Sequence, residues 1–206
     1  MYIPKHFAEH DIAEMHALIR AHPLAMLVSH GPDGLDANHI PLLLADAEPF
    51  GTLQGHIARA NPLWKAGNVA GEVLVVFQGE ESYISPSGYA TKAEHGKVVP
   101  TWNYAAVHAY GELRVIDDPH WIFAQISALT AAHEASLPQP WAVTDAPADY
   151  IEQMLGAIIG IEITMTRLLG KWKVSQNQPA ANQASLIAAM EKTGDPMAGL
   201  IRARKP

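Results

Sequence analysis

Apolar residues along this chain fall into short runs with the length of β-strands, and several runs are separated by tight turn signals. The strongest turn signal is Gly31-Pro32-Asp33-Gly34, which joins the first two runs into a hairpin. Pro41 interrupts the second run, so that run is predicted to be an edge strand or to be bulged there. The predicted strands cover residues 24–29, 35–44, 51–57, 72–78 continuing to 82–85, 105–116, 161–168 and 171–175, with the last two joined at Gly170.

Helical periodicity and capping residues appear mainly outside these runs. They predict helices over residues 11–21, 62–67, 119–135, 147–158 and 184–193. Because strands and helices do not alternate regularly, a doubly wound parallel sheet is not expected. The pattern predicts a mainly β protein, a closed or nearly closed antiparallel barrel with peripheral helices. We expect one domain over residues 1–206 with a C-terminal helical extension at about 178–206.

Composition excludes some classes of function. The 206 residues contain no cysteine, so disulfides, thiolate metal sites and a cysteine nucleophile are excluded. The 14 basic and 21 acidic residues give a net charge of −7, which argues against a broad nucleic-acid-binding face but leaves a small basic patch at residues 202–205. No signal pattern or membrane-length apolar run is present, so we expect a cytoplasmic protein without membrane contact.

The first candidate site is the segment Gly55–Pro62. A predicted strand brings His56 and Arg59 to a helix start at Asn61, where free backbone N–H groups favour a phosphate. Arg59 could add a bidentate contact to such a phosphate. The structural alternative is that Asn61 only caps the helix and Arg59 forms a surface ion pair.

The second candidate site lies between Thr91 and Asp117. Trp102 and Tyr104 offer flat apolar faces, while Thr101 and Asn103 offer directional hydrogen bonds, a combination that suits a planar heteroaromatic ligand. Lys97 could add a positive charge. The alternative is a barrel-closing strand whose aromatic side chains are core.

Two further patterns are more ambiguous. Alternation along the last predicted strand places Lys171 and Lys173 on one face and Trp172 on the other, which also fits an ordinary solvated lysine face. Four histidines could meet across a barrel to bind a metal, but they lack Cys or carboxylate partners at ligand spacing. These are His39, His56, His95 and His108, and any one of the four could instead be the axial ligand of a haem. Gly-rich phosphate loops and a nucleophile elbow are absent from the sequence.

The segments that carry a family resemblance are residues 1–7, 37–42, 55–62, 83–87, 91–111, 141–143, 161–163 and 170–177. These segments resemble the PaiB family, which is described as FMN-binding negative transcriptional regulators. That family is similar to the split-barrel flavoproteins, which include pyridoxamine-phosphate oxidases and flavin reductases. One departure is Gly88, where a bulkier residue, often Trp, is expected, and this departure would loosen one wall of the pocket.

The resemblance implies a six-stranded antiparallel split barrel that forms a homodimer with FMN in a groove at its interface. Arg59 and Asn61 would then hold the phosphate, and Thr101 to Tyr104 would line the isoalloxazine or the substrate. Lys171 and Trp172 would reach the flavin of the partner subunit. His56, His95 and Tyr104 are the only candidates for an acid or base.

Function remains open between several classes at this point. An FMN-dependent oxidoreductase with a small-molecule redox substrate, or a flavin-sensing regulator, is the first expectation. A repressor that binds DNA through the C-terminal helices is the second, and a haem-binding split barrel is the third.

Overall fold

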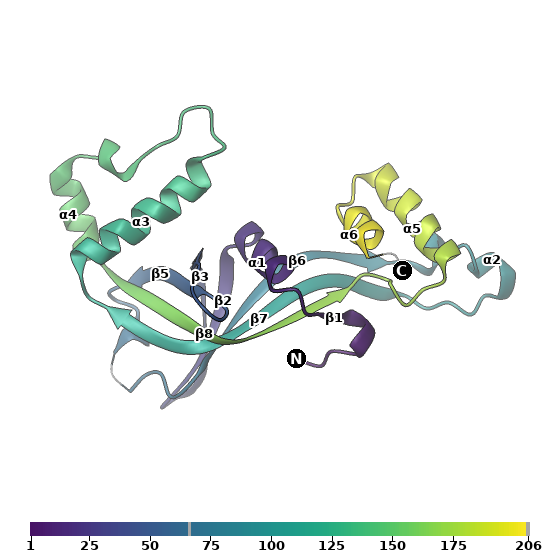
Figure 1. Ribbon diagram of the computed structural model, residues 1–206, viewed down its shortest axis with the longest axis horizontal. Helices are drawn as coiled ribbons and strands as arrows, with labels where there is room; N and C mark the ends of the chain where they lie inside the picture. Colours follow the sequence, from purple (N-terminus) through teal and green to yellow (C-terminus); the bar gives the residue numbers. More distant parts are fainter. Residues whose placement is uncertain (66, 205–206) are drawn as a thin grey trace. The chain divides into compact units, whose positions relative to one another are not determined.

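A computed structural model describes residues 1–65 and 67–204, and its chain divides into two compact units. Unit 1 comprises residues 1–18, 78–107 and 169–204, and unit 2 comprises residues 19–77 and 108–168. Three long strands contribute residues to both units (Figure 1): β6 (Val73–Ile84), β7 (Thr101–Ile116) and β8 (Ile158–Lys173). The single domain expected from the sequence stays a prediction.

Unit 2 is built on an antiparallel hairpin and a second strand pair that join the long strands. The hairpin consists of β2 (Leu24–Gly31) and β3 (Gly34–Pro41), paired from Leu24↔Pro41 to Gly31↔Gly34. Strands β4 (Leu43–Ala45) and β5 (Thr52–Ala58) form the second pair, and β5 lies antiparallel to β8 from Thr52↔Thr164 to Ala58↔Ile158. The sheet order is β3-β2-β6-β7-β8-β5-β4.

The core of unit 2 comes from alternate positions of these strands, as the period of two requires. The helical elements of this unit are η2 (Pro62–Trp64), α3 (Pro119–Glu134), η4 (Val143–Asp145) and α4 (Ala148–Gly156). Asp118 caps α3 by accepting a hydrogen bond from the His120 backbone N–H at 2.9 Å. The most deeply buried apolar side chains of the unit include Leu27, Leu42, Leu53, Phe77, Ile159, Ile161 and Ile163.

Unit 1 contains the C-terminal parts of β6 and β8, the first part of β7, and a group of helices. Its other elements are η1 (Lys5–Phe7), β1 (Ala8–Glu9), the first part of α1 (Ile12–Ala21), η3 (Pro86–Gly88), α2 (Lys92–His95), α5 (Ala180–Thr193) and α6 (Met197–Ala203). Helices α5 and α6 pack against each other (Figure 1). Helix α5 ends at Gly194, whose φ of 71° is a left-handed conformation that glycine adopts without strain.

The structure confirms the mainly β antiparallel split-barrel class, but the sheet has eight strands rather than six. Six strands are long, and the two additional ones, β1 and β4, contain only two and three residues. Segments this short carry no readable hydrophobic period. Among the described residues, no helix is both long and apolar enough to cross a membrane.

Three predicted elements are corrected. Strand β8 runs without a break through Gly170, because this glycine admits a neighbouring strand instead of a turn: Glu9 pairs with it, and a Cβ there would lie 2.8 Å from the Glu9 Cβ. The helix predicted at 62–67 is a single 3-10 turn, Pro62–Trp64. Strand β7 begins at Thr101 rather than at residue 105.

Candidate functional site

Two lysines near the end of β8 lie beside the start of β7 in unit 1. Lys171 is only 8% exposed; its Nζ donates to the Tyr2 carbonyl oxygen at 3.1 Å and lies 5.1 Å from the centroid of the Tyr104 ring. The Lys173 Nζ donates to the Thr101 hydroxyl and to the Trp102 carbonyl oxygen. Within residues 1–65 and 67–204, neither ammonium group has a carboxylate partner.

The environment of these lysines disfavours an unpaired positive charge. Burial lowers the pKa of Lys173, and the nearby charge of Lys171 lowers it further. A buried cation is stable when it is paired with an anion, so this pair of ammonium groups is suited to a negatively charged ligand.

An exposed aromatic pair is formed by Trp102 of β7 and Tyr83 at the end of β6. The ring centroids of Trp102 and Tyr83 are 5.8 Å apart with an interplanar angle of 65°, an edge-to-face arrangement. Both side chains remain about half exposed, at 54% and 53%. Unit 1 therefore combines open aromatic surface from β6 and β7 with two lysines of β8 that have no carboxylate partner among the described residues.

Buried polar side chains beside the start of β7 and the end of β8 form hydrogen bonds with one another. Asn103 is buried, and its Nδ2 donates to the Ser175 hydroxyl at 2.9 Å while that hydroxyl donates to Asn103 Oδ1 at 3.1 Å. The buried Tyr89 hydroxyl has no hydrogen-bond partner in the part of the chain that the structure describes. Burial raises the pKa of Tyr89, and the nearby Ser175 hydroxyl offsets part of that rise. Ser175 lies within the candidate segment at the end of β8, but neither it nor Tyr89 is predicted to be a site residue from the sequence.

Arg59 and Asn61, the residues expected to bind phosphate, lie in unit 2 and make structural contacts there. Arg59 donates to both carboxylate oxygens of Asp117, at 2.7 and 3.0 Å, and to the Gly156 carbonyl oxygen at 2.9 Å. Asn61 Oδ1 accepts from the Leu63 backbone N–H at 2.9 Å and so caps η2. The ion pair and the cap are thus the structural alternative considered above, and phosphate binding by these two residues stays a prediction.

The four candidate histidines are divided between the units. His56 Nδ1 lies 2.9 Å from Gln125 Oε1 in unit 2, the unit that also holds His39 and His108. Burial lowers the pKa of His108. In unit 1, His95 Nδ1 accepts from the Lys97 backbone N–H at 3.0 Å, and the Lys97 side chain is exposed. The described residues contain no group of three His, Asp or Glu side chains placed to hold a metal ion.

The C-terminal cations are largely engaged within unit 1. The Arg204 guanidinium lies 5.3 Å from the ring centroid of Trp172, which is 5% exposed, and pairs with Glu9 and Glu14. Arg202 pairs with Glu191. Lys205 lies outside the described residues. Among those that are described, the basic end of the helix pair is therefore neutralised, which weakens the case for DNA binding there.

Gly88 does not leave a hole in the site. A Cβ at this position would lie 2.8 Å from Leu186 Cδ2 of α5, so Leu186 fills the space that a larger side chain would occupy. The Ser185 hydroxyl fixes this contact by donating to the Gly88 carbonyl oxygen at 2.7 Å. Leu186 of α5 therefore occupies the space beside Gly88 that was expected to be loose.

Comparison with known proteins gives this arrangement a family. Residues 1–167 match the family model described as "Putative FMN-binding domain". An uncharacterised protein of Emericella nidulans is 37% identical, over 94% of this chain and 92% of that protein. The protease synthase and sporulation protein PAI 2 of Bacillus subtilis is 27% identical, over 96% of this chain and 93% of its own.

Solved structures support the same fold. The FAD and heme binding protein of Mycobacterium smegmatis superposes with a TM-score of 0.58 at 14% identity, covering 81% of this chain and 73% of its own. At this identity the likeness shows the fold alone. The family match covers most of the chain and names the cofactor that the resemblance to the PaiB family implied. The chain therefore belongs to the FMN-binding domain family that includes the PaiB-type proteins.

Proposed function

We propose that this protein binds FMN at the start of β7 and the end of β8 and is a flavin-dependent oxidoreductase acting on a small molecule. The observation that supports it is the pair of ammonium groups at Lys171 and Lys173, which lack a carboxylate partner in residues 1–65 and 67–204. Bound FMN supplies the hydride or electron transfer, and the protein supplies orientation and electrostatics.

In this proposal the lysines and the aromatic pair bind different parts of FMN. Lys171 and Lys173 neutralise the phosphate, and Lys173 is already oriented by its hydrogen bond to Thr101. Trp102 and Tyr83 offer the apolar surface on which a planar ring packs. Completion of the groove by a second copy of the chain, as the resemblance implies, belongs to the same proposal and is checked by the molar mass in solution with and without FMN.

Comparing FMN with riboflavin, which lacks the phosphate, isolates the contribution of the lysines to binding. We expect saturable quenching of FMN fluorescence and weaker binding of riboflavin. Lys173→Gln should weaken FMN binding about 10- to 100-fold, the effect of losing one charge-assisted hydrogen bond of about 1.5–3 kcal/mol. The same substitution should leave riboflavin binding nearly unchanged. Lys192→Gln, an exposed lysine of α5, is the matched control.

Two results would contradict the proposal. One is the absence of saturable FMN binding below about 100 μM, a limit of roughly −5.5 kcal/mol. The other is a loss of FMN affinity in Arg59→Gln with no loss in Lys173→Gln, which would move the phosphate to unit 2.

Redox activity needs its own experiment. The FMN-loaded protein is mixed anaerobically with NADH or NADPH, and loss of the visible flavin absorbance is followed, then its return on adding an acceptor. Turnover supports an oxidoreductase. Tight FMN binding without reduction by either donor would instead favour a flavin-sensing regulator.

A further inference from the structure

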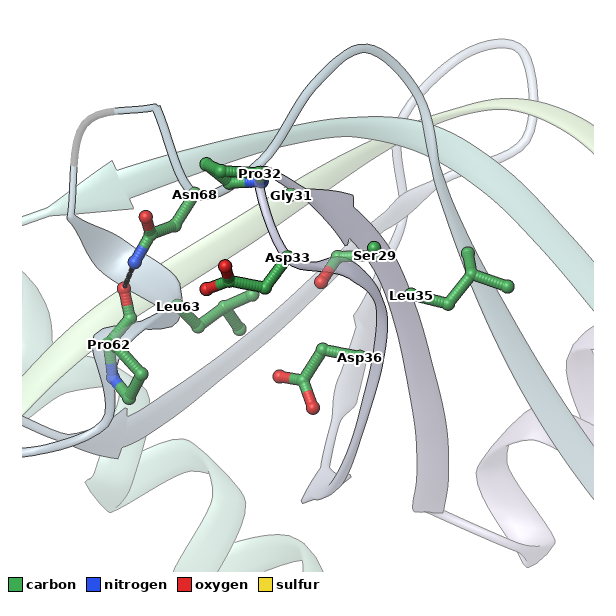
Figure 2. Close-up of a pocket in the computed structure, with 10 residues that line it drawn as sticks. Ser29, Gly31, Pro32, Asp33, Leu35, Asp36, Pro62, Leu63 and Asn68 are labelled. Carbon is green, nitrogen blue, oxygen red and sulfur yellow. Dashed lines mark hydrogen bonds between the residues drawn. The ribbon is translucent and has the colours of Figure 1, made fainter.

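A pocket lies in unit 2, at the turn of the β2–β3 hairpin (Figure 2). Its volume is about 340 Å³, enough for a small organic molecule. The hairpin contributes Ser29, Asp33 and Asp36, and the chain around η2 contributes Leu63 and Asn68. All of these residues belong to one unit, so the pocket is defined without reference to the flavin site.

Ser29 provides this pocket with a hydroxyl that can form a hydrogen bond to a ligand. The residue is only 3% exposed, and its hydroxyl makes no hydrogen bond within the part of the chain that the structure describes. Figure 2 shows its oxygen directed to the side on which Asp33 and Asp36 stand. This hydroxyl lines the pocket and has no partner among the described residues, so a ligand that donates a hydrogen bond can reach it.

The register of the hairpin brings a carboxylate next to this hydroxyl. Ser29 pairs directly with Asp36 across β2 and β3, so the two side chains share one face of the hairpin, with Cβ atoms about 4.5–5.5 Å apart. Asp36 Oδ2 accepts from Asn38 Nδ2 at 2.9 Å, and Asn38 Oδ1 accepts from Asn61 Nδ2 at 2.7 Å. This chain of hydrogen bonds orients the Asp36 carboxylate.

The remaining polar side chains are also acceptors. Asp33 has no ion-pair partner among the described residues, and no Lys, Arg or His lines the pocket. Asn68 Nδ2 is used in a hydrogen bond to the Pro62 carbonyl oxygen at 2.7 Å, which leaves its amide oxygen as an acceptor. The pocket therefore offers two carboxylates, a hydroxyl and an amide oxygen, a set that repels phosphate and attracts a hydrogen-bonding cation.

We propose that this pocket binds a small organic molecule through its ammonium group. An ammonium ion can donate to Ser29 and to both carboxylates at once, since it carries three N–H donors and one positive charge. Leu63 supplies apolar surface for the carbon part of the molecule. A metal ion is a poorer occupant, because no group of three metal-binding side chains is assembled among the described residues.

The test compares two ligands of similar shape and different charge. Amide resonances of ¹⁵N-labelled protein are followed while n-butylamine or n-butanol is added at neutral pH, where the amine is protonated. We expect saturable shifts, confined to residues 29–36 and the region of Leu63 and Asn68, with n-butylamine and none with n-butanol. Equal shifts with the two ligands would overturn the proposal.

Substitutions identify the groups responsible. The double variant Asp33→Asn/Asp36→Asn should weaken n-butylamine binding at least tenfold, and Ser29→Ala several-fold. Glu112→Gln, which removes an exposed carboxylate from β7, is the matched control and should bind as the unsubstituted protein does. Unchanged affinity in the double variant, or Ca²⁺ causing the same shifts and displacing n-butylamine, would refute an ammonium site.

Discussion

Asn103 and Ser175 exchange two hydrogen bonds, at 2.9 and 3.1 Å, across unit 1 although 72 residues separate them in the chain. Ser175 holds a φ of 62°, a left-handed conformation that residues other than glycine seldom adopt. The amide of Asn103 thus stabilises the turn that follows β8, immediately after the two lysines. The position of Lys173 depends on this turn as well as on the strand.

Replacing Asn103 by Ala should destabilise the fold. The substitution leaves the buried Ser175 hydroxyl without its partner, so we expect the free energy of unfolding to fall by about 1–3 kcal/mol. Urea unfolding followed by circular dichroism measures this change. Asn177→Ala, at an exposed asparagine just beyond the turn, should change stability by less than about 0.5 kcal/mol. Equal effects of the two substitutions would contradict the role given to the hydrogen bonds.

Gly111→Ala should be strongly destabilising. A Cβ at Gly111 would lie 2.3 Å from the Thr164 carbonyl oxygen, and a backbone atom within a sheet cannot move aside as a side chain can. We expect a loss of about 1–3 kcal/mol or more in the free energy of unfolding. Gly199→Ala, where a Cβ meets nothing within 4 Å, serves as the control in the same thermal unfolding experiment. A wild-type midpoint for Gly111→Ala would show that β7 and β8 are spaced more widely there.

The Arg59–Asp117 pair should contribute stability that depends on acid pH. The hydrogen bonds from Arg59 lower the pKa of Asp117 below its ordinary value of 3.8. The unfolded chain therefore takes up a proton first as the pH falls, so the contribution is complete well above pH 3.8 and is lost as the pH falls through the lowered pKa. Unfolding free energies of wild type and Asp117→Asn should differ near neutral pH and converge in acid. A difference that persists in acid would mean that the pair acts through packing.

Lys173 should make FMN affinity fall with rising alkaline pH. Its pKa is lowered from 10.5 by burial and by the charge of Lys171. A bound phosphate favours the charged ammonium group, so FMN binding takes up a proton wherever the free protein holds Lys173 neutral. The dissociation constant should therefore rise as the pH rises through that lowered pKa. FMN binding titrations at a series of pH values should show this rise in the wild-type protein but not in Lys173→Gln. The same titrations with riboflavin correct for any effect of the flavin ring's own titration.

Most local elements could be predicted because their signals lie within a few residues. Asp118 followed by Pro119 marked the start of α3. Pro41 indicated an edge or a bulge within one run over 35–44, whereas in the structure β3 ends at Pro41 and β4 begins at Leu43. Gly170 was misread as a turn because a sequence shows that a side chain is missing but not which neighbour needs the space. The cap at Asn61 was recognised, but its second hydrogen bond, to Asn38, depends on tertiary contact.

The sequence by itself determined the mainly β class, the capped helices and the membership of an FMN-binding family, because period, caps and long motifs are properties of contiguous residues. Only the tertiary structure decided which cations are free to bind. Arg59 meets a carboxylate 58 residues away, whereas Lys173 meets a hydroxyl and a carbonyl oxygen more than 70 residues away. The physical reason is that a charge is neutralised by whatever folding places within a few ångströms of it, and spacing along the chain does not reveal that neighbour.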